Sequence, residues 1–357
     1  MADQRSSYAS DRTLRRTALL AVLFAGAVVF LGAFTRLVDA GLGCPDWPGC
    51  YGHVLWPTSD AEISLAEAAF PDAPVDLSKT WPEMVHRYFA AALGLIIVAF
   101  TVWALRGERS RGAPPVVHAV ALLAMVVLQG AFGAWTVTLK LWPQVVTAHL
   151  LGGFTTLALL WLLALRAGAI GLPAVLRVPP ALRFHAGLAL LVVVVQIALG
   201  GWVSSNYAAL ACPDLPTCHG DWLPAMDVAA GFNVAQQVGP NYLGGMLENE
   251  ARVAIQVVHR LGAVVVALIV GALVLRLRRT NSPLAWPLAG ILVCQLALGV
   301  VNVVWVLPLW SATAHNAFGA ITLLAVVTVN YGAFAARESR AAGVVTNDSL
   351  TSNALPV

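Results

Sequence analysis

The chain has 357 residues, of which 59% are hydrophobic and only 11% are charged, and its formal net charge is +3 at pH 7. Soluble domains carry about 25% charged residues, so this composition and a mean hydropathy of +0.77 exclude an ordinary soluble protein. The basic residues do not cluster with interleaved aromatic residues, which argues against a nucleic-acid partner. The sequence therefore predicts an all-α membrane protein in contact with membrane lipids.

Apolar segments of about 20 residues are long enough to cross a bilayer as helices. Eight such segments occur in chain order, at 17–38, 82–105, 116–138, 144–165, 184–204, 252–275, 285–306 and 311–335. The first segment is too long for the core of a signal peptide and has no convincing cleavage site, so we interpret it as a retained helix.

The charges in the connecting loops alternate along the chain. Arginines lie before the first segment, in every second connection and after the last segment, whereas the long connections 39–81 and 205–250 carry mainly aspartate and glutamate. Positively charged loops stay in the cytoplasm. We therefore expect both termini to be cytoplasmic and the two long acidic loops to lie on the outer face.

The second half of the chain repeats the first. Three segments recur: 129–149 as 295–315, 83–87 as 256–260, and 44–50 as 212–218. Segments one to four therefore correspond to segments five to eight. Each unit has an even number of segments, so both enter the membrane in the same direction. This predicts two four-helix bundles related by a pseudo-twofold axis along the membrane normal.

Each half carries two histidines near the outer ends of two parallel segments, His86 with His149 and His259 with His315. Two imidazoles that face each other at one depth are the axial ligands of a six-coordinate heme. A zinc or copper site would need further ligands that the neighbouring sequence does not offer. The alternative is that the histidines form hydrogen bonds between helices.

Charged residues accompany the first histidine of each half. Arg87 and Arg260 directly follow these histidines, and each could bind a heme propionate or extend to the outer interface. Glu83 stands one turn before His86, whereas Gln256 occupies this position in the second half. A carboxylate there could stabilise positive charge or position water, or it could merely favour the helix N-terminus.

Both outer loops contain two cysteines separated by five residues, Cys44 with Cys50 and Cys212 with Cys218. An oxidising compartment favours disulfides at these positions. We expect them to staple the loops, although a pair above a heme could also exchange electrons or thiols. Cys294, in the seventh segment, is expected to be a free thiol in the core.

Taken together, the motifs resemble those of the heme A synthase family over about residues 17–335. They are GLGCPDWPGC at 41–50, ExxHR at 83–87, TAH at 147–149, QxxHRLGA at 256–263 and TAHNAFG at 313–319. The resemblance implies a multi-pass enzyme of the bacterial cytoplasmic (inner) membrane. Its reaction would oxidise a ring methyl of heme O to a formyl group, by two hydroxylations and loss of water, giving heme A for terminal oxidases.

The resemblance also implies roles for individual residues. His86 and His149 would hold the substrate heme, with Arg87 beside them and Glu83 as the catalytic carboxylate. His259 and His315 would ligate a permanent heme b, with Arg260 beside them. All four histidines would then be iron ligands near the outer face. Heme O would be delivered by a heme O synthase; a homo-oligomer is allowed, and the electron partner is not specified.

The resulting plan has five parts. They are a cytoplasmic segment 1–16, a substrate half 17–166, a cytoplasmic linker 167–183, a heme b half 184–336 and a polar, disordered cytoplasmic tail 337–357. Two other functions could use the same four histidines. A di-heme b-type electron-transfer cytochrome would not need Glu83, and a heme carrier or transporter would hold heme only as cargo.

Overall fold

The computed structural model describes residues 12–107, 114–168 and 178–351, with side chains described up to residue 334. Within these ranges the protein is helical and contains no strand, apart from two isolated bridges, Cys50–His53 and Cys218–Asp221. Eight of the described helices are long and apolar enough to cross a membrane. The prediction of an all-α, multi-pass membrane protein is thereby confirmed.

The eight long helices coincide with the predicted segments, with differences of a few residues at most ends. They are α2 (Arg12–Leu37), α4 (Leu77–Arg106), α5 (Val116–Thr138), α6 (Pro143–Arg166), α7 (Arg183–Ser205), α9 (Asn249–Arg279), α10 (Ala285–Val304) and α11 (Leu309–Thr351). The last helix differs most, because α11 continues to Thr351 through residues predicted to be disordered. The final residues, 352–357, lie outside the described ranges.

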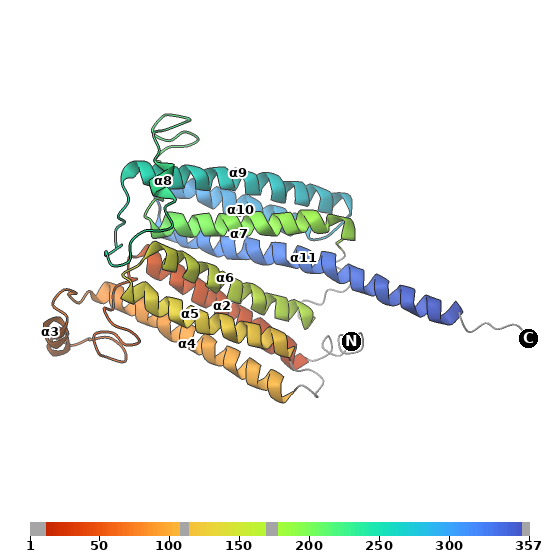
Figure 1. Cartoon of the computed structure of the whole chain (residues 1–357), viewed down its shortest axis with the longest axis horizontal. Coiled ribbons are helices and arrows are strands. Elements are labelled where there is room, and N and C mark those ends of the chain that lie inside the picture. The colour runs from red at the N-terminus through yellow and green to blue at the C-terminus, as the bar shows by residue number, and fades with distance from the viewer. Residues whose placement is uncertain (1–11, 108–113, 169–177, 352–357) are drawn as a thin grey trace, which may run out of the picture.

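The helices run side by side along one axis (Figure 1). In the first half, α4 and α6 each pack against both α2 and α5; in the second half, α9 and α11 each pack against both α7 and α10. The halves meet where α6 contacts α7 and where α11 contacts α2 and α6. This packing makes α4 diagonal to α6 and α9 diagonal to α11. The pseudo-twofold relationship between the halves remains a prediction.

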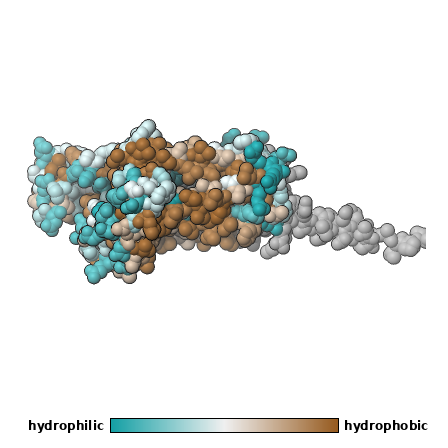
Figure 2. Space-filling view, turned by 90° about the horizontal axis from the view of Figure 1, so that it is seen from above, coloured by the Kyte–Doolittle hydropathy of each residue, from teal (hydrophilic) through white to brown (hydrophobic). Residues whose placement is uncertain are grey.

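The surface along the helices is apolar and the ends are polar, as Figure 2 shows for one face. Large side chains such as Leu23 and Leu268 remain 71% and 68% exposed. Such a surface is stable only against lipid, because a soluble protein rarely exposes apolar patches of this extent. The helix backbones satisfy their own hydrogen bonds, as the hydrocarbon core of a bilayer requires.

The two long loops lie at the same end of the helices (Figure 1). The first contains α3 (Asp60–Ala69), whose start is stabilised by a capping box between Ser59 and Glu62. The second contains the short helix α8 (Val228–Gly231) and reaches across to the first half, where Trp142 Nε1 donates to the carbonyl of Gln236 at 3.1 Å. The two long loops therefore contact each other's half of the protein at this end of the helices.

One expectation about the core is wrong. Cys294 is exposed on α10 and not buried. The buried residues of α10 are Ala285, Leu288, Leu292 and Val303, which recur at the three-to-four-residue spacing of one helix face. Cys294 lies two positions after Leu292 and thus falls off this face.

Candidate heme sites

The first histidine pair connects two helices that are diagonally opposite. His86 of α4 and His149 of α6 have ring centres 6.4 Å apart, and the rings are nearly perpendicular, at 82°. Since α2 and α5 pack on both of these helices, the pair spans the interior of the four-helix group. Cofactor sites in bundles are built in this way, from side chains on facing helices.

The separation of the rings fits a single metal ion between them. Two imidazoles that ligate one ion from opposite sides, with metal–nitrogen bonds of about 2 Å, have ring centres about 6 Å apart. Nδ1 of each ring is buried and has no hydrogen-bond partner among the described side chains. The separation of the ring centres, on two facing helices, is therefore what fits this pair to a heme iron.

A glycine on a neighbouring helix lies against each of the four histidine rings. A Cβ added at Gly32 of α2 would lie 2.8 Å from Cε1 of His86, which no side chain could occupy without displacing the ring. The other three pairs, with their Cβ-to-Cε1 distances, are Gly133 with His149 at 3.6 Å, Gly200 with His259 at 3.3 Å and Gly299 with His315 at 3.3 Å. Small residues of this kind allow close approach between membrane helices.

The second histidine pair follows the same plan. His259 of α9 and His315 of α11 lie on helices that both pack against α7 and α10. Side-chain amides contact both rings: Gln196 Nε2 lies 3.2 Å from Nδ1 of His259, and Gln295 Nε2 lies 3.4 Å from Nε2 of His315. These histidines therefore have polar side-chain neighbours that His86 lacks.

Glu83 is buried at 5% exposure and is directed at the first disulfide loop. Its carboxylate accepts a hydrogen bond from the backbone N–H of Cys44 at 2.9 Å and forms an ion pair with Arg87 Nη2 at 2.5 Å. Arg87 Nη1 donates in turn to the carbonyls of Asp46 at 3.0 Å and Gly49 at 2.5 Å. The loop is thus fastened to α4 next to His86.

The second loop is fastened differently. Arg260 Nη2 donates to the carbonyl of Cys212 and Nη1 to that of Thr217, both at 2.9 Å. Gln256 stands where Glu83 stands in the first half, and its buried Oε1 has no partner among the described residues. Arg260 Nε is likewise buried and unpaired. In both halves an arginine next to the histidine bonds the disulfide loop, but only the first half has a carboxylate one turn before that histidine.

Both predicted disulfides are present, Cys44–Cys50 and Cys212–Cys218. An aspartate organises each turn: Asp46 accepts from the N–H groups of Tyr51 and Gly52. Asp214 does the same for residues 219 and 220. The Thr217 hydroxyl, the N–H of Gly220 and the N–H of His219 lower the pKa of Asp214 to about 2. Hydrogen bonds to a carboxylate favour its charged form.

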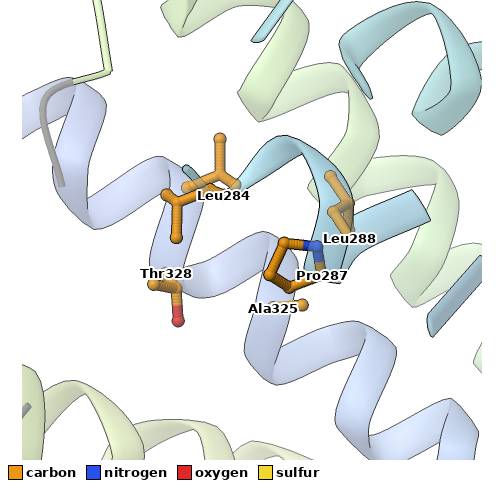
Figure 3. A pocket seen from close by; sticks show the side chains of 6 residues that line it. Leu284, Pro287, Leu288, Ala325 and Thr328 are labelled. Atoms are coloured by element: carbon orange, nitrogen blue, oxygen red, sulfur yellow. The ribbon is translucent and has the colours of Figure 1, made fainter. Parts of the chain in front are cut away.

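A small cavity of about 160 Å³ lies away from the histidines, between α10 and α11 (Figure 3). It is lined by Leu284, Pro287, Leu288, Ala325, Thr328 and Val329. An apolar cavity of this size holds a molecule such as benzene, and it is far too small for a heme. We assign it no function.

Two of the other histidines, His118 and His219, have structural surroundings. His118 on α5 is buried, with Nε2 2.9 Å from the carbonyl of Leu159 and Nδ1 2.9 Å from Arg166. His219 Nε2 lies 2.9 Å from the carbonyl of Ala211. Neither belongs to a facing pair, so neither resembles the four histidines above.

Several site residues have no role in the sequence interpretation. They are the four glycines that contact the histidine rings, together with Gln196 and Gly262. The internal repeat contains part of this signal, since Gly133 aligns with Gly299, and Gly32 with Gly200. Which ring each glycine contacts is decided by the packing of the helices.

Comparison with known proteins gives one consistent result. The family described as cytochrome oxidase assembly protein, COX15-CtaA, matches residues 15–327. A protein named heme A synthase from Shewanella oneidensis is 43% identical over 87% of this chain and 94% of its own length. Proteins of the same name from Mesorhizobium japonicum and Chelativorans sp. are 30% and 32% identical, over 88% and 83% of this chain and 90% and 84% of their own lengths.

Proposed function

This chain belongs to the COX15-CtaA family of cytochrome oxidase assembly proteins, and we propose from this membership that it acts as a heme A synthase. Relatives with that name match this chain over 94% and 90% of their own lengths. The reaction oxidises a ring methyl of heme O to the formyl group of heme A. The observation that supports it best is the facing of His86 and His149 across the first four helices, beside the buried carboxylate of Glu83.

The two halves have different tasks in this proposal. His86 and His149 hold the substrate heme O, and His259 and His315 ligate a resident heme b. The second assignment is supported by the side-chain amide of Gln196, which contacts Nδ1 of His259. Arg87 and Arg260 lie beside the two sites. The unpaired Nε of Arg260 suits it to bind a heme propionate, since guanidinium groups form strong, directional bonds with carboxylates.

The chemistry requires two successive hydroxylations of one methyl carbon. Each replaces a C–H bond by C–OH and removes two electrons, and the resulting diol loses water to leave the formyl group. Heme b, when bound, supplies a one-electron redox centre in the same molecule. Glu83 contributes a buried negative charge that stabilises positive charge at the carbon or orients a water. Gln256 cannot do this, because it carries no charge.

The location follows from the distribution of charge. Arginines dominate the connections at one end of the helices and acidic residues dominate the long loops at the other. We propose that the loop end faces outward from the bacterial inner membrane, that both termini are cytoplasmic, and that both heme sites lie near the outer face. The parts of the chain are then the substrate half 17–166 and the heme b half 184–336, related by a pseudo-twofold axis, and a heme O synthase supplies the substrate.

The test is extraction of hemes, with acidified acetone, from membranes that contain this protein together with a heme O synthase. Chromatography and mass spectrometry should detect heme A or its hydroxymethyl precursor. Membranes with the heme O synthase alone are the control. Unchanged heme O with well-folded protein would contradict the proposal and favour a cytochrome or a heme carrier.

A further inference from the structure

Gln196 of α7 holds the ring of His259 in one orientation. Its Nε2 lies 3.2 Å from Nδ1 of His259 and donates to the backbone carbonyl of the same residue at 3.0 Å. The amide thus contacts the histidine at two points. Its Oε1 is buried and has no partner among the described residues. Gln196 Oε1 is therefore available to accept a further hydrogen bond.

The space for this amide is provided by a glycine. A Cβ added at Gly262 would lie 2.1 Å from Gln196 Oε1 and 3.1 Å from Cδ1 of Leu199. Any other residue at position 262 would force the amide to move. Gly262 is one turn beyond His259 on α9, so the same helix supplies both the ligand and the space for its neighbour.

The first half has no such pair. The repeat aligns Gln196 with Val28 and Gly262 with Phe89. Phe89 stacks on Phe24 of α2, with ring centres 5.4 Å apart and planes within 7°. Apolar side chains therefore occupy the places of the amide and the glycine, and the His86 ring has the backbone carbonyl of Val28 beside it in place of a side-chain amide. The other amide, Gln295, aligns with Gln129; Gln295 contacts Nε2 of His315, whereas the buried Nε2 of Gln129 has no partner among the described residues.

We propose that Gln196, in the space left by Gly262, is a positioning residue that makes the second site retain its heme, and that its absence beside His86 lets the first site exchange heme. This inference rests on the proposed function, which assigns resident heme b to the second half and substrate to the first. It concerns retention and the electronic properties of the axial ligand rather than the oxidation itself.

The chemistry of imidazole gives the mechanism. A neutral histidine that ligates iron through Nε2 carries its proton on Nδ1 and needs an acceptor there. Exchanging the positions of the two Gln196 amide atoms would place Oε1 where Nε2 lies 3.2 Å from Nδ1, so that Oε1 accepts the Nδ1 proton in exchange for the bond to the His259 carbonyl. A bond of this kind fixes the tautomer and increases the basicity of the ligand, and losing it costs about 10–100-fold in metal affinity. A ligand without it releases its metal more readily.

The experiment compares Gln196→Leu with Gln196→Glu in the purified full-length protein. Transfer of heme b to apomyoglobin should be about 10–100-fold faster from the Leu variant, with a raised midpoint potential and altered low-spin resonances. The Glu variant keeps an acceptor oxygen and should retain heme and a low potential. If Gln196 only filled space, Leu would behave normally and Glu would lose heme, which would overturn the proposal.

Two further variants separate this inference from the function on which it rests. Gly262→Ala should reproduce the fast transfer of the Leu variant, whereas Gly271→Ala, on the same helix with no atom within 4 Å of its added Cβ, should not. His259→Leu must lose heme b if the second half holds it. Loss of heme in His259→Leu with normal retention in Gln196→Leu overturns the inference alone, and retention in His259→Leu overturns the site assignment.

Discussion

The backbone N–H of Cys44 donates a 2.9 Å hydrogen bond to the carboxylate of Glu83, 39 residues further along the chain. One end of the first disulfide is thereby bound directly to the acid that distinguishes the two halves. Glu83 in turn lies one turn before His86 on α4. The loop closed by Cys44–Cys50, the carboxylate and the proposed substrate ligand form one connected unit.

Replacing Glu83 by Gln should abolish product while leaving heme b in place. Glutamine can still accept from Cys44 N–H, but it carries no negative charge. Removing an electrostatic contribution to a transition state lowers turnover by about 100-fold or more. Conversion of heme O should be measured by chromatography and heme b by the optical spectrum. Gln256→Leu, at the equivalent place in the second half, is the control. Normal conversion by the Gln variant would exclude Glu83 from catalysis.

Substitutions of the four histidines should fall into two groups, according to whether heme b or the conversion of heme O is lost. His259→Leu and His315→Leu should lose heme b, because leucine cannot ligate iron. His86→Leu and His149→Leu should keep heme b and lose conversion of heme O. The measurement is the reduced-minus-oxidised spectrum of each purified variant, normalised to protein. Heme b that survives in both second-half variants would show that these histidines are not its ligands.

Removing a disulfide should impair the function of the half of the protein that contains it. Replacing Cys44 and Cys50 by Ser removes a closed loop worth about 2 kcal/mol of unfolding free energy and loosens the donor to Glu83, so conversion should fall while heme b stays. Replacing Cys212 and Cys218 should weaken heme b retention, since Arg260 is bonded to the carbonyl of Cys212. Thermal unfolding in detergent and heme content measure both effects. The opposite pattern would contradict the assignment of the halves.

The glycine beside His86 should be sensitive to a single methyl group. Alanine at Gly32 brings a Cβ to 2.8 Å from Cε1 of His86 and should displace the ring, with loss of heme O conversion. Alanine at Gly26, on the same helix with no atom within 4 Å of its added Cβ, should leave conversion normal. Glycine-to-alanine changes otherwise stabilise helices by about 1 kcal/mol, so a general loss of folding is not expected. Equal activities of the two variants would refute the steric argument.

The second loop should loosen in acid. The pKa of Asp214 is lowered to about 2 in the folded protein, chiefly by the Thr217 hydroxyl. A lowered carboxyl pKa stabilises the folded form above the unfolded pKa of about 4, and the contribution is lost as the pH falls from about 4 to about 2. The rate at which a phosphine reduces Cys212–Cys218, divided by the rate for Asp214→Asn at the same pH, should therefore rise as the pH falls over this range. The ratio cancels protonation of the phosphine, and a ratio that is flat with pH would contradict the prediction.

The sequence alone was sufficient for the membrane class, the eight helices and the two disulfides. Apolar length and loop charge act locally along the chain, so they can be interpreted without knowing which helices touch. The internal repeat adds that the two halves carry histidines at the same positions, with Glu83 against Gln256 as the main difference. The prediction from local pattern that Cys294 lies in the core was wrong, because the buried face of α10 depends on which helices pack against it.

Only the tertiary structure decided which groups meet. The ring of His86 faces His149 because α4 and α6 are diagonal, and it lies against Gly32 because α2 packs beside α4. The bond from Gln196 to His259 joins residues 63 positions apart, which no local pattern encodes. Contacts between helices depend on side-chain volumes at two distant places at once. The need for glycine at position 262 can be explained only from the structure, because the Gln196 amide occupies the space that a Cβ would fill.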